Sequence, residues 1–322
     1  MNKLERGNMM EYDYYISFIF AARNDDYCNN FIERFQITLN CLQFLCEKYN
    51  LSYEIVIVEW SPLLNKRLRD VLRFDNYNKN VRIITVPSKF NDKIPPSPFD
   101  IVDIGVLNFF EYHAKNIGIR QAKGEYILCS NSDIIFSESL IELLSKKKLL
   151  KKHFYRAYKY RMKRDIPNGL TYYELLKFCK KKSYVSSRGK GNKGGKGNRG
   201  GIFAPGAGDF FLMHRDNYED VRGYPEIRCD GLGIDDFILY CSSVFLKQFI
   251  FEDPPHRVYH QLHQKRWETY DRRHHTIEGN KQMMVKYNRL KNKMKKKKIN
   301  LNPNGENWGF NDFDFEGETI NE

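Results

Sequence analysis

Residues 113–137, HAKNIGIRQAKGEYILCSNSDIIFS, carry the clearest structural pattern in the chain. Residues 114–121 have apolar and small side chains at helical spacing, Gly124 can end that helix, and residues 126–129 form a short apolar run typical of a buried strand. Asp133 follows where such a strand would leave the core. Ligands of open α/β sheets bind outside the carboxyl ends of the strands, and an acid there can hold a divalent cation against a phosphorylated ligand.

Strands and helices also alternate before this stretch. Apolar and β-branched runs predict strands at 14–22, 53–60 and 81–87, and residues 31–45 have the apolar spacing of a helix. Alternating strands and helices indicate a mostly parallel, doubly wound α/β sheet with helices on both faces.

The second half of the chain has less regular patterns. We expect a lysine-tipped helix at 138–152, an exposed ribbon or edge strand of alternating aromatic and basic residues at 154–162, and a strand at 210–213. A further helix would carry Asp235 and Asp236 in its first turn.

Length and composition predict a folded protein without a membrane span. The chain has 322 residues, of which 41% are hydrophobic and 15% aromatic, enough to bury a large core. No apolar run approaches the roughly 20 residues that cross a bilayer, and the first ten residues are polar, so we expect a cytoplasmic protein. Seven cysteines without a C-x-x-C pair are predicted to be reduced core thiols.

The positive charge is concentrated in one segment. Residues 151–200 contain 16 Lys and Arg against two acids, Asp165 and Glu174, while the whole chain has a net charge of +13. Such a block suggests binding of nucleic acid or another polyanion, or a basic insertion beside a site for an anionic nucleotide. Its glycine-rich part, 183–201, is predicted to be a flexible insertion, either solvated or acting as a lid that contacts an acceptor.

The end of the 113–137 stretch resembles a known metal-binding segment. Its K-G-E-Y-I-L run followed by Asn131, Ser132 and Asp133 resembles the part of GT-A glycosyltransferases that ends in their D-x-D signature. Asn131 replaces the first acid, so Asp133 is the only carboxylate of the triplet. The resemblance implies that Asp133 binds Mn²⁺ or Mg²⁺ and that His260 or His263 completes the site. An Asn-Ser-Asp turn without a ligand is the alternative.

Two earlier strand ends resemble the nucleotide half of the same enzymes. By this resemblance Arg23 would meet the diphosphate or the base, and Glu59 would accept a hydrogen bond from the base or the ribose. The implied donor-binding residues are Ala21, Ala22, Arg23, Asn24, Glu59, Trp60, Lys115, Asn116, Asn131 and Ser132.

Residues 231–236, GLGIDD, resemble the G-x-G-x-E-D motif of inverting GT-A enzymes, galactosyltransferases included. The resemblance implies that Asp236 is the general base for an acceptor hydroxyl and that Asp235 orients the acceptor. Gly208, Asp209 and Gly233 would contact the acceptor. The alternative is that the two acids only stabilise the positive end of a helix.

The resemblance covers residues 14–265 and implies a single GT-A catalytic domain at 1–280. Residues 14–137 would bind the nucleotide sugar and residues 202–265 the acceptor. A basic helix and an acidic, aromatic tail would follow at 281–322, the tail either docked on the body or disordered.

The implied activity is metal-dependent transfer of a sugar, with inversion, from a UDP-sugar or another nucleotide-sugar donor to a glycan or protein acceptor. One alternative is a nucleic-acid or polyanion-binding protein that uses residues 151–200, which would not explain the acids at the strand ends. The other is a sugar nucleotidyltransferase, although its glycine-rich, basic N-terminal loop is missing.

Overall fold

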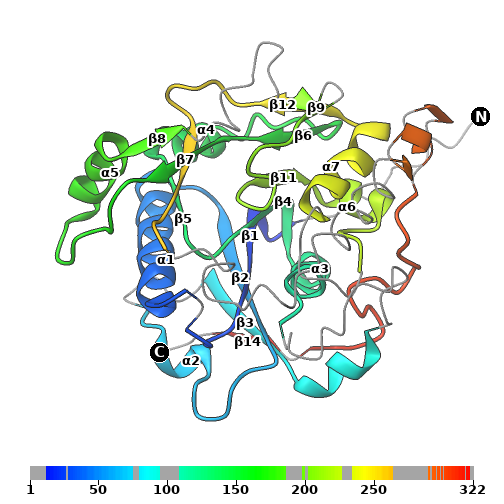
Figure 1. Ribbon diagram of the computed structural model, residues 1–322, viewed down its shortest axis with the longest axis horizontal. Coiled ribbons are helices and arrows are strands. Elements are labelled where there is room, and N and C mark those ends of the chain that lie inside the picture. The colour runs from blue at the N-terminus through cyan, green and yellow to red at the C-terminus, as the bar shows by residue number, and fades with distance from the viewer. Residues whose placement is uncertain are drawn as a thin grey trace, which may run out of the picture.

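A mixed β-sheet forms the centre of the computed structural model (Figure 1), with strand order β12-β6-β11-β4-β1-β2-β3-β14. The structure describes residues 12–26, 28–74, 80–94, 109–185, 198–199, 202–226, 234–263, 289–290, 292–294, 296–297, 299, 301–315 and 317–319. The strands of this sheet are β1 (Tyr14–Ala22), β2 (Tyr53–Trp60), β3 (Val81–Val86), β4 (Gly124–Ser130), β6 (His153–Arg156), β11 (Phe211–His214), β12 (Lys247–Ile250) and β14 (Gly317–Thr319).

The strands β3, β2, β1 and β4 are parallel, and β11 runs antiparallel to both β4 and β6. The connections between the parallel strands pass through helices, as in a doubly wound sheet. The α/β sheet predicted for a GT-A fold is therefore confirmed. The strands predicted at 14–22 and 53–60 have the predicted bounds.

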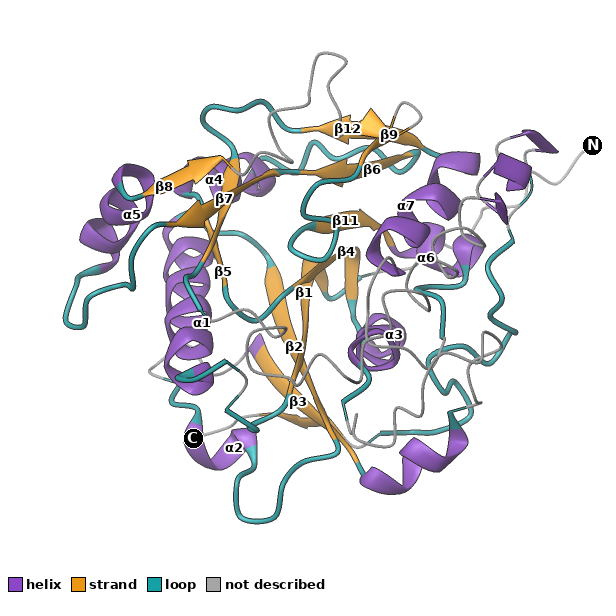
Figure 2. Ribbon diagram, in the orientation of Figure 1, coloured by secondary structure: helices purple, strands orange, loops and turns teal. Residues whose placement is uncertain are grey.

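Helices cover both faces of the sheet (Figure 2). Side chains alternate between the two faces along each strand. Phe20 of β1 packs on Phe35 in a helix on one face, while Ile19 contacts Gly118 in a helix on the other face. A Cβ on Gly118 would lie 2.5 Å from Ile19 Cγ2, so the glycine lets that helix approach the sheet. The helices are α1 (Phe31–Lys48), α2 (Leu68–Val71), η2 (Ser88–Lys93), α3 (Glu111–Gln121), α4 (Glu138–Ser145), α5 (Tyr172–Lys181), α6 (Arg215–Val221) and α7 (Ile234–Phe245).

A second sheet, in the order β5-β13-β7-β8, extends the fold beyond the carboxyl end of β4. It consists of β5 (Ile134–Phe136), β13 (Arg257–His260), β7 (Tyr158–Met162) and β8 (Ser183–Val185); β9 (Asn198–Arg199) and β10 (Ile202–Phe203) form a separate ribbon. The β5–β13 pair is antiparallel and places His260 opposite Ile134.

The helix predicted at 138–152 is shorter than expected, since α4 ends at Ser145. Lys147 has a positive φ of 52°, which interrupts the helix. The backbone N–H groups of Leu149 and Leu150 then donate to the hydroxyl groups of Tyr15 and Tyr155. These tertiary bonds hold the following residues in an irregular connection to β6.

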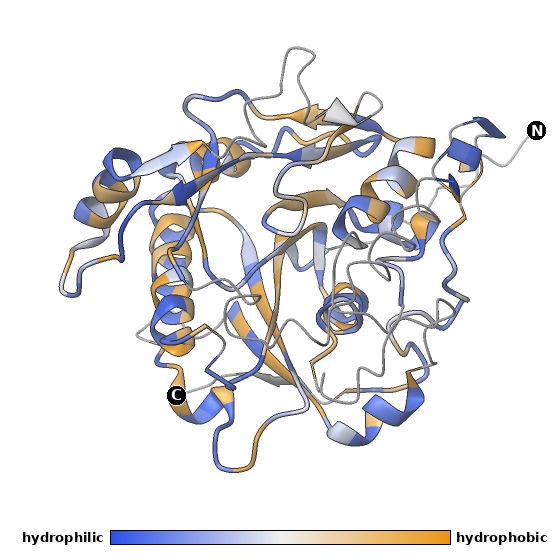
Figure 3. Cartoon of the chain, viewed as in Figure 1, coloured by the Kyte–Doolittle hydropathy of each residue, from blue (hydrophilic) through white to orange (hydrophobic). Residues whose placement is uncertain are grey.

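The exposed ribbon predicted at 154–162 is wrong. The segment is split into β6, an interior strand between β12 and β11, and β7 of the second sheet. Although β7 is mostly hydrophilic (Figure 3), Lys159 points to the buried carboxylate of Asp209, and Arg156 of β6 is fully buried. The alternation of aromatic and basic residues therefore reflects two inward-facing cations.

The prediction that Gly124 ends the preceding helix is wrong. The helix α3 stops at Gln121, and Gly124 is the first residue of β4. A Cβ at this position would lie 2.6 Å from Ser17 Oγ, which accepts a hydrogen bond from Gly124 N. The glycine is required by the close approach of β4 to β1.

The C-terminal tail is docked on the body over residues 301–315, which confirms one of the two alternatives. Trp308 is 2% exposed, and the guanidinium of Arg120 lies 4.0 Å from the centre of its ring system. Phe315 packs on Phe90, and β14 pairs with the edge of β3. The tail thus shares the hydrophobic core of the domain predicted at 1–280.

The remaining predictions from composition can be compared with the described residues only. The six cysteines among them are free, and five are buried. No helix in this part of the chain is long and apolar enough to cross a membrane. Most of the glycine-rich insertion and of the predicted basic helix lies outside the described residues.

We predict that Trp308→Ala lowers the free energy of unfolding by about 3–5 kcal/mol, because it leaves a cavity in the core. Urea denaturation would measure the loss. Phe313→Ala is the matched control, since Phe313 is 37% exposed and should cost clearly less. If Trp308→Ala lowers the free energy of unfolding as little as Phe313→Ala does, the tail adds no core of its own.

Candidate active site

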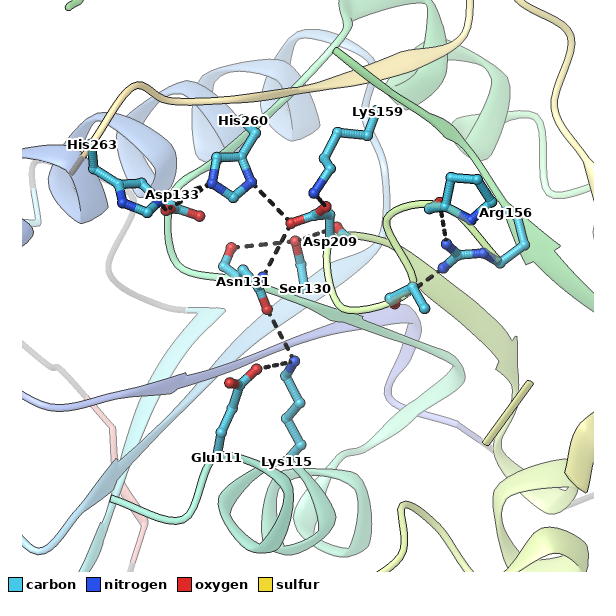
Figure 4. A network of polar contacts seen from close by, with 12 residues as sticks. Glu111, Lys115, Ser130, Asn131, Asp133, Arg156, Lys159, Asp209, His260 and His263 are labelled. Carbon is cyan, nitrogen blue, oxygen red and sulfur yellow. Dashed lines mark hydrogen bonds and ion pairs between the residues drawn. The ribbon is translucent and has the colours of Figure 1, made fainter. Parts of the chain in front are cut away.

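Three potential metal ligands converge after the carboxyl end of β4 (Figure 4). Asp133 Oδ2 lies 3.5 Å from His260 Nε2 and 3.1 Å from His263 Nε2, and the two nitrogens are 2.9 Å apart. A cation about 2.1 Å from each of its octahedral ligands has neighbouring ligands about 3.0 Å apart. The three atoms therefore match one face of an octahedron, and both histidines fit, where the sequence left a choice between them.

Backbone pairing holds these ligands. Asp133 directly precedes β5, and Gln261 N, one residue beyond the end of β13, donates to Asp133 O at 3.0 Å. The Gln261 side chain donates to Thr38 Oγ1 and to Arg34 O on α1. The segment that carries His260 and His263 is thus anchored to both the sheet and a helix.

Asp133 is prepared to act as an anionic ligand. Burial alone would raise its pKa, but His260 and His263 outweigh burial and lower it. Asp133 Oδ1 is buried and accepts no hydrogen bond from the described residues, so it can bind a ligand at no cost in existing bonds. Two imidazole nitrogens and one carboxylate form a mixed donor set that fits a divalent transition-metal ion.

A second buried carboxylate, Asp209, lies beside this cluster. Its oxygens contact Lys159 Nζ, His260 Nδ1 at 3.1 Å and Asn131 Nδ2 at 3.1 Å. Burial raises the pKa of Asp209, but Lys159 and His260 lower it well below its usual range. Asp209 is 2% exposed, so its side chain is enclosed by these neighbours.

Asn131 suits its position between Lys115 and Asp209. Lys115 Nζ can only donate, so the Asn131 oxygen faces it at 3.1 Å, and the Asn131 amide N–H group donates to Asp209. An aspartate at 131 would place two carboxylates side by side, and the second could not ionise without strong repulsion.

Lys115 connects the metal ligands to the acids of α7. It is fully buried and also donates to Glu111 Oε1 at 2.6 Å. Burial lowers the pKa of Lys115, but Glu111 and Asp235 raise it above its ordinary value, so the ammonium stays charged. Lys115 therefore bonds to Asn131 and is near enough to Asp235 for their charges to attract.

Asp235 is the least compensated acid of the site. Burial raises its pKa to about 7, although Lys115 lowers it in part. Its Oδ1 is buried without a hydrogen-bond partner among the described residues. A Cβ on Gly208 would lie 2.6 Å from Asp235 Oδ2, so two predicted acceptor-side residues do meet. Asp236 follows in the first turn of α7, as predicted.

Three of the predicted donor-binding residues make hydrogen bonds within the fold. Glu59 is fully buried, and its Oε1 accepts from the backbone N–H of Leu68 in α2 at 2.7 Å. The Trp60 indole is also buried and donates to Asn91 Oδ1. Asn116 is buried and bonds the backbone of Tyr224. These three side chains are occupied within the fold.

The other predicted positions lie at the ends of β1 and β4. Ala21 and Ala22 are the last residues of β1 and are buried, whereas Arg23 and Asn24 follow it and are half-buried. Arg23 lies 4.0 Å from Asp25. Ser132 is half-buried between the two metal-side residues Asn131 and Asp133, and Gly233 lies outside the described residues.

Sequence reasoning missed the cations Lys159 and Arg156 as parts of the site. Arg156 donates to Ala207 O at 3.1 Å and Pro205 O at 2.9 Å, which fixes the loop before Asp209. Burial lowers the Arg156 pKa to about 10, so it remains charged at neutral pH. The sequence did hold a signal for Arg156. It lies two residues after Phe154, and side chains two residues apart in a strand point to the same face, so a buried Phe154 predicts an inward-facing Arg156.

A cavity of about 320 Å³ opens beside His263. It is lined by the start of α1, including Asn30 and Arg34, and by Asp165 of the connection between β7 and α5. Of the three potential metal ligands, His263 is the one that lines this cavity.

No protein-family model matches the chain, and no curated protein matches it in sequence. Among solved structures, S. aureus TarS 1-349 is similar with a TM-score of 0.45 and 12% identity, over 77% of this chain and 60% of that one. The same protein in complex with UDP-GlcNAc gives a TM-score of 0.44 at 12% identity, over 80% and 61%. The catalytic domain of Drosophila beta1,4-galactosyltransferase 7 in complex with xylobiose gives 0.44 at 10% identity, over 84% and 79%.

The chain spans about 60% of the length of the S. aureus structure. Similarity at these scores does not establish a shared activity, so the functional assignment depends on the site itself.

We predict that Asn131→Asp destabilises the protein increasingly as pH rises. The new carboxyl group would have a raised pKa in the folded state. The loss in the free energy of unfolding is therefore small near pH 4 and reaches about 1–3 kcal/mol at pH values above 7. Thermal unfolding at both pH values measures it. Asn168→Asp adds the same charge at an exposed position and should show no such trend.

Proposed function

We propose that the protein is a metal-dependent glycosyltransferase of the GT-A type that transfers a sugar from a nucleotide-sugar donor to an acceptor hydroxyl with inversion. UDP is the proposed nucleotide. The observation that carries the proposal is one buried polar network at the carboxyl end of β4. It links a metal-ligand cluster, Asp133 with His260 and His263, to the acid at the start of α7, Asp235.

A divalent cation held by Asp133, His260 and His263 would neutralise the charge on the departing nucleoside diphosphate. Since two of the three ligands are imidazoles, the set favours Mn²⁺ over Mg²⁺, which prefers oxygen ligands. Lys115 pairs with Glu111, and Lys159 pairs with Asp209, where it helps to outweigh burial and lowers the pKa of that carboxyl group. Glu111, Asp209 and the two lysines thus leave little net charge in the network.

The proposed reaction is a single displacement. The acceptor oxygen forms a bond to the anomeric carbon as the bond from that carbon to the diphosphate oxygen breaks, and the configuration inverts. A carboxylate at the start of α7 takes the acceptor proton. We assign this role to Asp236, with Asp235 orienting the acceptor beside Gly208.

Asp235 is the competing base. Its pKa of about 7 lies where a general base works best at neutral pH, and its buried Oδ1 lacks a hydrogen-bond partner among the described residues. The two assignments differ in which substitution stops the reaction and in the pH at which the rate falls.

The rival function, binding of nucleic acid or another polyanion, loses part of its basis in this structure. Two cations of the 151–200 block, Arg156 and Lys159, bind internal oxygens and are not available to phosphates at the surface. A sugar nucleotidyltransferase shares the proposed metal chemistry and would require a nucleoside triphosphate with a sugar phosphate. The cytoplasmic location stays a prediction from the sequence.

We predict that UDP binds more tightly with Mn²⁺ than with EDTA, and that Asp133→Ala and His263→Ala abolish this difference. Affinity in EDTA should hardly change, because the variants remove only cation ligands. Isothermal titration calorimetry provides both values. His256→Ala is the control, since its ring contacts Glu252 O and Phe251 and does not belong to the metal-ligand cluster. If the wild type binds UDP equally well with Mn²⁺ and with EDTA, the metal has no part in nucleotide binding and is removed from the proposal.

We predict that Asp236→Asn lowers turnover by about 10²–10⁴ while donor affinity stays near that of the wild type. Asp235→Asn should mainly weaken acceptor binding. If Asp235 is the base instead, its variant loses turnover, and the wild-type kcat/KM falls as pH drops below about 7, because only the ionised carboxylate accepts a proton. Steady-state rates with a panel of nucleotide sugars and acceptors, measured from pH 5 to 9, separate the two cases.

A further inference from the structure

We propose that Asp209 is a positioning residue that aims His260 Nε2 at the cation, a role that rests on the proposed metal site. Asp209 comes from the loop before β11, whereas His260 ends β13 and Asp133 precedes β5. His260 lies between the two acids: its Nδ1 contacts Asp209 Oδ1, and its Nε2 faces Asp133 Oδ2 (Figure 4).

The hydrogen-bonding capacity of Asp209 determines the tautomer of His260. An ionised carboxylate can only accept, so the contact of 3.1 Å between Asp209 Oδ1 and His260 Nδ1 requires a proton on Nδ1. In the neutral ring, Nε2 then carries the lone pair. That nitrogen faces Asp133 Oδ2 and His263 Nε2, so the lone pair points into the ligand triangle.

Asp209 is itself held firmly enough to orient another side chain. Lys159 pairs with Oδ2, and Asn131 donates to Oδ1. Its backbone is fixed as well, because Asp209 N donates to Gly206 O at 3.0 Å and Ser130 Oγ donates to Asp209 O at 2.8 Å. Since these contacts come from β4, β7 and the Gly206 turn, the carboxylate has a single position.

The partners of a metal-bound histidine's second nitrogen typically change metal affinity by 10- to 100-fold when they are removed. Asp209 also contributes negative charge near the cation, which alone would favour binding. Lys159 offers a way to separate the two effects, because its removal together with that of Asp209 leaves the local net charge unchanged.

The experiment measures Mn²⁺ affinity of the full chain by electron paramagnetic resonance of the free ion, without donor or acceptor. Relative to the wild type, the charge-balanced double variant Lys159→Met/Asp209→Ala should weaken Mn²⁺ binding about 10- to 100-fold. Asp209→Asn in the Lys159→Met background keeps an oxygen that can accept from Nδ1 and should recover most of the loss. Lys159→Met alone should not weaken binding.

A second readout tests the tautomer directly. With Mg²⁺ or Zn²⁺ in place of Mn²⁺, ¹⁵N spectra of labelled histidine should show a hydrogen-bonded Nδ1–H for His260 in the wild type. This signal should disappear in Lys159→Met/Asp209→Ala while circular dichroism shows an unchanged fold.

The outcomes separate this inference from the proposed function. If the wild type binds Mn²⁺ and the charge-balanced Ala variant binds it equally well, the positioning role of Asp209 is wrong while the metal site stands. If Ala and Asn variants lose affinity equally, hydrogen bonding to His260 is not the cause, and the inference is again refuted. If the wild type binds no metal, the proposed metal site fails first.

Discussion

The antiparallel pairing of β13 with β5 is the interaction on which the candidate site depends. It brings histidines from near residue 260 beside an acid that follows β4. The pair is stabilised by buried apolar side chains, Ile135 and Phe136 on one strand and Val258 on the other. Hydrophobic burial therefore supplies the free energy that holds the polar ligands, whose own desolvation opposes folding.

Charge compensation is the second constraint. Asp209 is matched by Lys159 and Glu111 by Lys115, while two imidazoles lie beside Asp133. The pairing with Lys159 and the contact with His260 outweigh burial and hold the pKa of Asp209 below its usual range. Burial raises the pKa of Asp235 to about 7, since Lys115, which also pairs with Glu111, offsets that effect only in part. Poorly compensated acids of this kind are concentrated at functional sites.

Much of the architecture could be read from the chain because the central strands bury both faces. The runs at 14–22 and 53–60 are apolar throughout, and a strand is the element that fits such short runs between polar turns. The prediction failed at 138–152 and 154–162. There the backbone bonds to distant tyrosines and the cations bond to buried oxygens, and neither partner is visible in the local pattern.

The sequence by itself determined the order of strands and helices, the acid after β4, the two late histidines and the acid pair that starts α7. Local patterns report these features because the periodicity of side chains follows the backbone of each segment. Only the tertiary structure decided that both histidines face Asp133, that Glu59 and Trp60 are occupied within the fold, and that Asp209 supports a ligand. Those outcomes depend on which polar groups become neighbours after packing, and residues far apart in the chain acquire their charge and hydrogen-bond partners only then.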